Sequence, residues 1–207
     1  MLRPRVLLSA VILAIIIAPG ALAFPLMSDP AAMPAWQGSK TFYATDGIHL
    51  VDVQVEYAVY APGAFPGDDA SGGTDYVYAY EIFNDFDPDS LAISILTVGL
   101  MPGCGAHNIG WQAGPPGQVG GAAPDFASIS VSALSARWFF ITDTVNYAED
   151  SATLVFTSPK EPRWMSGSVT DGGVSVFESL PSPMPEPATL GLLAAGGLLL
   201  LRRRARA

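Results

Sequence analysis

The sequence predicts a mainly β protein, built as an antiparallel β-sandwich, on three observations. Apolar and polar residues alternate with a period of two along most of the chain between its ends, as in strands that bury one face. Segments rich in glycine, proline and aspartate, such as residues 61–75, separate these strands. No stretch between the ends has a helical period longer than about two turns. Short strands of this kind favour an Ig-like or jelly-roll sandwich over the alternative, a closed barrel.

The expected strands can be followed along the chain. The clearest covers residues 51–59, where valines and a tyrosine share one face and polar residues share the other. Residues 74–84 repeat this alternation with tyrosines at 76, 78 and 80. We expect eight or nine strands over about 150 residues, enough for the single domain that we place at residues 24–179. The other expected strands are 91–100, 126–134, 136–145, 151–158, 163–170 and 173–179.

Charge is distributed unevenly along the 207 residues. Residues 24–187 contain all nineteen acidic residues and only four basic ones, which gives this part a formal charge of −15. Such a surface repels nucleic acid and anionic lipid, because binding to either depends on lysine and arginine. The four basic residues are Lys40, Arg137, Lys160 and Arg163, and the single cysteine, Cys104, excludes a disulfide within the chain.

Residues 1–23 have the three parts of a secretory signal peptide. Arg3 and Arg5 precede an apolar run, and Pro19-Gly20 breaks that run before Ala21-Leu22-Ala23. Ala21 and Ala23 fit the small residues that signal peptidase requires, so we expect export by the Sec machinery and cleavage after Ala23. The alternative is an uncleaved membrane helix, for which the apolar run is short compared with the ~20 residues of a span.

The carboxyl end has a proline-rich stem at residues 180–187, an uncharged segment at 188–201 and an arginine-rich tail at 202–207. A helix of fourteen residues is about 21 Å long against a hydrocarbon core of about 30 Å, which makes it a marginal span. The arginines after it recover part of the mismatch, so we expect a short transmembrane helix. The positive-inside rule holds its end in the cytoplasm, which places residues 24–187 outside the inner membrane. The tail residues that set this topology are Arg202, Arg203, Arg204 and Arg206.

Pro185-Glu186-Pro187, the apolar segment and the terminal arginines follow one another in an order that resembles the PEP-CTERM sorting signal of bacterial exported proteins. The resemblance implies processing by an exosortase-type membrane enzyme, with Pro185, Glu186 and Pro187 as recognition residues. The two prolines also keep this peptide extended and accessible at the membrane surface. Phrases such as YAVYAPG and LVFTSPKEP are similar to the extracellular β domains that often precede this signal. The alternative for residues 178–188 is an ordinary proline-rich stem.

Few residues of the exported part indicate chemistry. Asp85, Asp87 and Asp89 alternate like the first ligands of a calcium loop, but Ser90 and Leu96 depart from that pattern, which favours a plain turn. Asp68-Asp69 is a poorer candidate in another loop. The only histidines are His49 and His107, and the latter could pair with Cys104 as a thiol and imidazole, although no orienting residue is identifiable.

Aromatic residues could form a sugar-stacking platform on a sheet face, but aromatics with a period of two more often pack in a core. We therefore expect a non-catalytic exported protein of the cell surface or extracellular matrix, without a cofactor, held transiently at the membrane. Exopolysaccharide is an expected partner. The alternative is a carbohydrate-binding module, with or without calcium, and a third hypothesis is a hydrolase. The aromatic candidates are Trp36, Trp111, Trp138, Trp164, Tyr76, Tyr78 and Tyr80.

Overall fold

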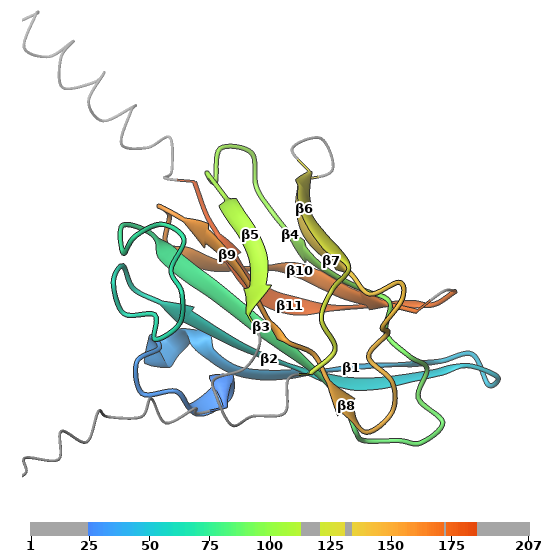
Figure 1. Cartoon of the computed structure of the whole chain (residues 1–207). Coiled ribbons are helices and arrows are strands. Elements are labelled where there is room, and N and C mark those ends of the chain that lie inside the picture. The colour runs from blue at the N-terminus through green and yellow to red at the C-terminus, as the bar shows by residue number, and fades with distance from the viewer. Residues whose placement is uncertain (1–24, 113–120, 131–133, 172, 186–207) are drawn as a thin grey trace, which may run out of the picture.

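The computed structural model describes residues 25–112, 121–130, 134–171 and 173–185. They form two antiparallel sheets of six and five strands, consistent with a β-sandwich (Figure 1). The prediction of a mainly β fold is therefore confirmed. The predicted signal peptide, Glu186, Pro187, the membrane segment and the arginine tail lie outside the described residues.

The six-stranded sheet has the order β1-β2-β3-β9-β5, and the short β8 pairs with β3. A long hairpin joins β1 to β2, and the register places Phe42 opposite Val53 and Tyr57 opposite Tyr80. Alternation along β2 then buries one valine after another on the inner face. The strands are β1 (Gln37–Thr45), β2 (Leu50–Tyr60), β3 (Tyr76–Asn84), β5 (His107–Gln112), β8 (Glu149–Asp150) and β9 (Thr153–Ser158).

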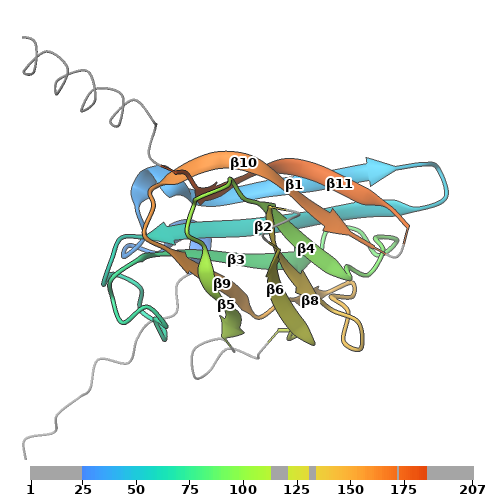
Figure 2. The ribbon, with the colours of Figure 1, turned by 90° about the horizontal axis from the view of Figure 1, so that it is seen from above.

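The five-stranded sheet has the order β11-β10-β4-β7-β6. Its edge strand β11 lies beside β1, and β6 lies beside β5, so the two sheets are in contact along both edges. Figure 2 shows β10 and β11 crossing β1 in a view from above. The strands are β4 (Ile95–Gly99), β6 (Phe126–Ser130), β7 (Ser135–Phe139), β10 (Pro162–Thr170) and β11 (Ser175–Pro183).

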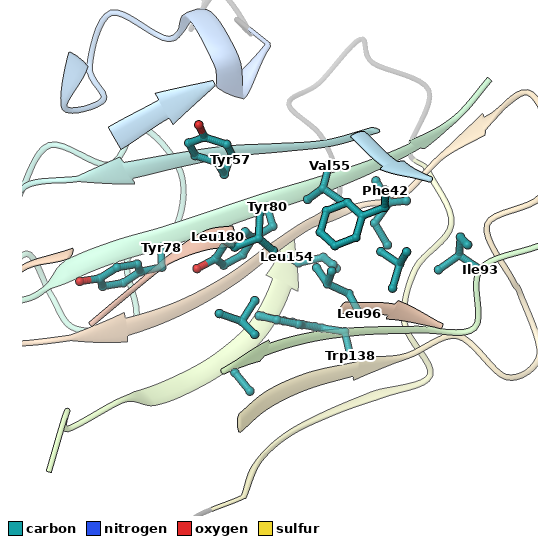
Figure 3. Packing of buried hydrophobic residues seen from close by; sticks show 14 of the residues in the cluster. Phe42, Val55, Tyr57, Tyr78, Tyr80, Ile93, Leu96, Trp138, Leu154 and Leu180 are labelled. Carbon is teal, nitrogen blue, oxygen red and sulfur yellow. The ribbon is translucent and has the colours of Figure 1, made fainter. Parts of the chain in front are cut away.

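Aromatic and branched aliphatic side chains fill the space between the sheets (Figure 3). Trp138 of β7 is completely buried, packs 5.9 Å from the ring of Tyr80, and donates its indole N–H to the Gly110 carbonyl at 2.7 Å. Tyr78 stacks on Phe156 at 5.0 Å. The contacts of Trp138 join strands of both sheets, so the aromatic residues of the sequence pattern form the centre of the core.

A second, smaller cluster covers the outer face of the six-stranded sheet. Two 3-10 turns, η1 (Leu26–Ser28) and η2 (Pro34–Trp36), bring Leu26 and Ala32 onto Ala58, Tyr60 and their neighbours. The Tyr60 hydroxyl donates to Asp29 Oδ2 at 2.8 Å, which fixes this segment on the sheet.

Several strand boundaries differ from the sequence prediction; the strand expected at residues 91–100, for example, covers only Ile95–Gly99. The strand expected at residues 136–145 ends at Phe139, because the Asp125 carboxylate accepts the N–H groups of Ile141 and Thr142 and bends the chain there. The sequence also did not predict β1 or β5 as separate strands. Alternation is weak in both, since β1 and β5 are edge strands with mostly part-exposed side chains.

The stem expected to begin at residue 180 is ordered strand as far as Pro183. Leu180 is fully buried, the Tyr80 hydroxyl donates to the Pro181 carbonyl, and Ser182 Oγ donates to the Gly99 carbonyl at 2.6 Å. Prolines are compatible with β11 because it is an edge strand, paired only with β10, and an edge needs no N–H on its open side. The β domain therefore extends four residues beyond the expected boundary at 179.

Candidate functional site

The chain leaves the folded domain beside the start of β10. After β11, the Met184 N–H donates to the Glu161 carbonyl at 2.9 Å, and Arg163 Nη1 donates to Met184 Sδ at 3.2 Å. Pro185, the first residue of the predicted sorting tripeptide, is part-buried next to these contacts. The tripeptide therefore follows the last strand directly, and only Met184 lies between β11 and Pro185.

An aromatic cluster lies at the same place, and we call Trp36, Lys40, Tyr57 and Trp164 the aromatic corner. The ring of Trp164 lies 5.1 Å from that of Trp36 and 5.5 Å, edge-on, from that of Tyr57. Lys40 Nζ lies 5.6 Å from the centre of the Trp164 ring, which is a cation–π contact. Trp164 is nevertheless 41% exposed, so the corner is accessible at the surface.

Gly38 makes room for this cluster. A Cβ at this position would lie 2.9 Å from the Tyr57 hydroxyl oxygen, and the backbone has a φ of +150°, at the limit of the region that favours glycine. The glycine at the start of β1 thus allows Tyr57 to reach the edge where Trp164 packs against it.

The predicted aromatic platform is not one surface. Tyr78, Tyr80 and Trp138 are fully buried in the core, as their period of two indicates. Tyr76 is part-buried, and Trp111 is 38% exposed on β5, the far edge strand of its sheet from β1. Only Trp36 and Trp164 of the seven candidates contact each other through an exposed ring.

The calcium candidates lie in the turn after β3 and do not converge. The Asp89 N–H donates to Asp87 Oδ1 at 2.8 Å, an arrangement that stabilises a turn, and Asp85 is exposed. In the second loop, Asp69 accepts hydrogen bonds from Ser71 in the same way. Within the part of the chain that the structure describes, no three His, Cys, Asp or Glu side chains are grouped so as to hold a metal ion.

Cys104 and His107 have separate surroundings. The thiol of Cys104 is buried in the core, whereas His107 is exposed and places Nδ1 2.7 Å from the Gly105 carbonyl. Its Nε2 lies 3.1 Å from Asp75 Oδ2, and the two form an ion pair only when the imidazole is protonated. The structure therefore does not support a thiol and imidazole pair.

His49 lies in the turn of the β1–β2 hairpin. Its Nδ1 lies 3.0 Å from Asp46 Oδ2, and this contact raises the pKa of His49 and lowers the pKa of Asp46. The pair lines a cavity of about 500 Å³ together with residues of the β10–β11 turn. The carboxylate of Asp171 faces this cavity but accepts the N–H of Gly173 at 2.7 Å, so it serves the turn itself.

Two carboxyl groups that the sequence did not single out lie opposite each other on neighbouring strands. Glu56 of β2 pairs with Glu81 of β3, on the face away from the core. Burial raises the pKa of Glu81 to about 8, and the nearby carboxylates of Asp150 and Glu56 add to the shift. Burial also raises the pKa of Glu56, which accepts the Met27 N–H at 3.2 Å. Alternation alone could not find this pair, because it depends on the register across the β2–β3 loop.

This pair predicts that the domain loses stability as the pH rises. In the folded state Glu81 binds its proton below about pH 8, whereas its ordinary pKa is 4.5. The stabilisation is thus complete below about pH 4.5 and disappears as the pH rises through 8. The free energy of unfolding of Glu81→Gln, relative to that of wild type, is expected to increase by about 2 kcal/mol from pH 5 to pH 9, after allowance for screening and coupling. Urea unfolding at both pH values measures this difference.

Glu178→Gln, on an exposed position of β11, is the control for the loss of a negative charge. An equal change in both variants would show that the effect comes from net charge and would contradict the role of Glu81.

The chain thus contains a domain of two antiparallel sheets, and an aromatic and basic surface lies where the chain leaves β11. Comparison with protein-family models, with curated proteins and with solved structures found no match for the chain. The resemblance to the sorting signal therefore rests on residues 185–207 of the sequence alone. Among residues 25–112, 121–130, 134–171 and 173–185, no helix is sufficiently long and apolar to span a bilayer.

Proposed function

We propose that this chain is a non-catalytic exported protein that an exosortase-type enzyme sorts and cleaves at its carboxyl-terminal signal. Sec export and signal peptidase release the amino end, and the carboxyl segment holds the protein transiently at the inner membrane. The mature protein then resides at the cell surface or in the extracellular matrix, where exopolysaccharide is the expected partner. We also propose that the two sheets form a sandwich of the Ig-like or jelly-roll type.

The observation that carries this proposal is the order of elements after β11. Pro185-Glu186-Pro187, an uncharged segment and an arginine cluster follow the last strand with only Met184 in between. An ordinary stem has no reason to end in a short apolar segment and a basic tail. Supporting the non-catalytic assignment, the separate surroundings of Cys104 and His107 leave no thiol and imidazole pair for a nucleophilic mechanism.

The contacts of β11 limit where the processing enzyme can cut. A cut before Pro181 would remove both the carbonyl that accepts the Tyr80 hydroxyl and the Ser182 hydroxyl that donates to Gly99. The peptide after Met184 has no described strand partner, since β11 ends at Pro183. The mature carboxyl terminus is therefore expected at Pro185 or beyond, and mass spectrometry of the released protein measures it. A terminus before Pro185 would contradict this expectation.

Changing the tripeptide to Ala-Gln-Ala (Pro185→Ala, Glu186→Gln, Pro187→Ala) is expected to block processing. The variant should accumulate as a larger species that fractionates with the membrane, because the apolar segment and arginines stay attached. Immunoblots of membrane and medium fractions from the native host measure both size and location.

The control is Pro102→Ala, which removes a proline from an exposed turn of the domain. If the tripeptide variant is released at the size of wild type, the sorting proposal is wrong. If both variants are retained, the defect lies in folding and not in recognition.

A further inference from the structure

We infer that the aromatic corner, with Arg163, is the face on which the β domain rests against the membrane surface while its carboxyl segment is inserted. This inference rests on the proposed function, which puts residues 188–201 in the bilayer. It adds an interaction surface of the domain itself, and an orientation of the domain during processing.

The chain leaves the fold close to both the aromatic corner and the predicted membrane segment. Arg163 contacts Met184, and the Met184 N–H donates a hydrogen bond to the Glu161 carbonyl. The point where the chain leaves the fold is therefore fixed beside the aromatic corner. The uncharged segment begins at Ala188, three positions after Pro185. Even fully extended, three residues span only about 10 Å. The corner is thus held close to the headgroups for as long as the segment stays inserted.

Basic residues of the exported part gather near the aromatic corner. Three of the four basic residues between 24 and 187 lie here: Lys40 on Trp164, Arg163 on Met184, and Lys160 in the turn between β9 and β10. Glu161 is the acidic residue of the same turn. Figures 1 and 2 show the end of β11 and the start of β10 at the same end of the molecule as η1 and η2. In Figure 2 the loop 61–75, which carries Asp68, Asp69 and Asp75, lies on the other side of that end.

The overall charge of the exported part makes this placement an orienting force. A domain with a formal charge of −15 is repelled by an anionic surface in most orientations. A tether of about 10 Å is close to the Debye length of about 8 Å, so the domain feels the surface charge. The orientation with the basic corner toward the lipid is the least repulsive one.

The side chains of the aromatic corner are of the types found at the interface between lipid and water. Tryptophan is enriched at the interface between lipid and water, where its ring meets acyl chains and its N–H meets water. Lysine and arginine place their aliphatic parts on apolar surface and their charges among headgroups. Trp164 has Lys40 over its ring at an exposed position, and the exposed Arg163, the preceding residue of β10, contacts Met184 at the point where the chain leaves the fold.

A polysaccharide is the competing ligand for exposed aromatic rings, and the contacts of Trp164 favour the membrane. Its ring already contacts Trp36, Tyr57 and Lys40, so a sugar that stacks on it has to displace the lysine. A lipid surface can accommodate the same arrangement without any displacement.

The test uses the full chain reconstituted in vesicles of phosphatidylcholine with phosphatidylglycerol, with a quencher of tryptophan fluorescence placed on the lipid near the headgroup. We expect quenching of wild type and at least a twofold smaller quenched fraction for Trp164→Phe. Trp111→Phe, on the far sheet edge, should not lower the quenched fraction, because it removes a tryptophan that the lipid quencher does not reach. Lys40→Gln with Arg163→Gln should reduce quenching about as much as high salt does, and Arg137→Gln on β7 is the matched control.

Each outcome decides one question. A chain that does not enter the vesicles contradicts the proposed membrane segment and, with it, this inference. A chain that enters but gives the same quenched fraction for wild type and Trp164→Phe contradicts the inference alone. Binding of the cell's own exopolysaccharide that is lost in Trp164→Phe, together with no quenching by lipid, assigns the corner to sugar instead.

Discussion

A chain that begins at Phe24 and ends at Ser179 is expected to be unfolded, whereas one that ends at Pro185 is expected to fold. The shorter chain loses Leu180, which is completely buried in the core. Loss of such a side chain costs roughly 2–5 kcal/mol. The Tyr80 hydroxyl also loses its acceptor in a fully buried position, which adds about 1–3 kcal/mol. A total of about 5 kcal/mol is comparable to the whole stability of many domains.

Circular dichroism and guanidinium unfolding of the two chains measure this difference. A third chain, ending at Pro183, serves as the control, because it keeps all of β11 and removes only Met184 and Pro185. Equal unfolding midpoints for the chains ending at Ser179 and Pro185 would show that residues 180–183 are a stem after all.

Trp138→Ala is expected to destabilise the domain by about 4 kcal/mol, in the range measured for buried large aromatic residues. The indole fills the centre of the core between Tyr80 and Phe156, and its N–H satisfies the Gly110 carbonyl. Its loss leaves a cavity between the sheets and an unpaired carbonyl on β5. The midpoint of guanidinium unfolding measures the effect.

Trp111→Ala is the matched control, because Trp111 is on β5 but 38% exposed. It is expected to cost about 2 kcal/mol, less than Trp138→Ala, because 38% of its surface already contacts water and its loss leaves no enclosed cavity. A similar loss of stability in both variants would contradict the division of the tryptophans into core and surface.

The period of two was sufficient to predict the fold class and much of the core. Val51, Val53 and Val55 are completely buried, as their alternation with polar residues requires. The same reasoning found β3, with Tyr78 and Tyr80 inside. It missed β1 and β5 because an edge strand buries only part of each side chain, which weakens the alternation.

Strand β11 continues past the expected boundary at residue 179 for a physical reason. Alternating prolines predict a segment outside a sheet, because proline has no N–H to donate to a neighbouring strand. Proline is excluded from central strands for this reason, but an edge strand tolerates it. Pro181 and Pro183 belong to β11, whose only strand partner is β10. A sequence does not state which strand will be an edge.

The candidate site was predicted only in part. Trp36 and Trp164 were among the aromatic candidates, but they contact each other although they are 128 positions apart in the sequence. Lys40 over Trp164, and the pairing of Glu56 with Glu81, depend on how strands are arranged in space. No local spacing in the sequence encodes such neighbours, whereas the turn at Asp87 and Asp89 is local and was interpreted correctly.

The prolines of β11 have a consequence for crowded surroundings. A free strand edge is a template on which a neighbouring molecule can add a strand and begin to aggregate. Pro181 and Pro183 have no N–H to offer there, and the Pro181 carbonyl is occupied by Tyr80. The last part of β11 therefore cannot be extended by a second copy. At the proposed cell surface, this part of β11 would not act as a template for strand addition between neighbouring copies.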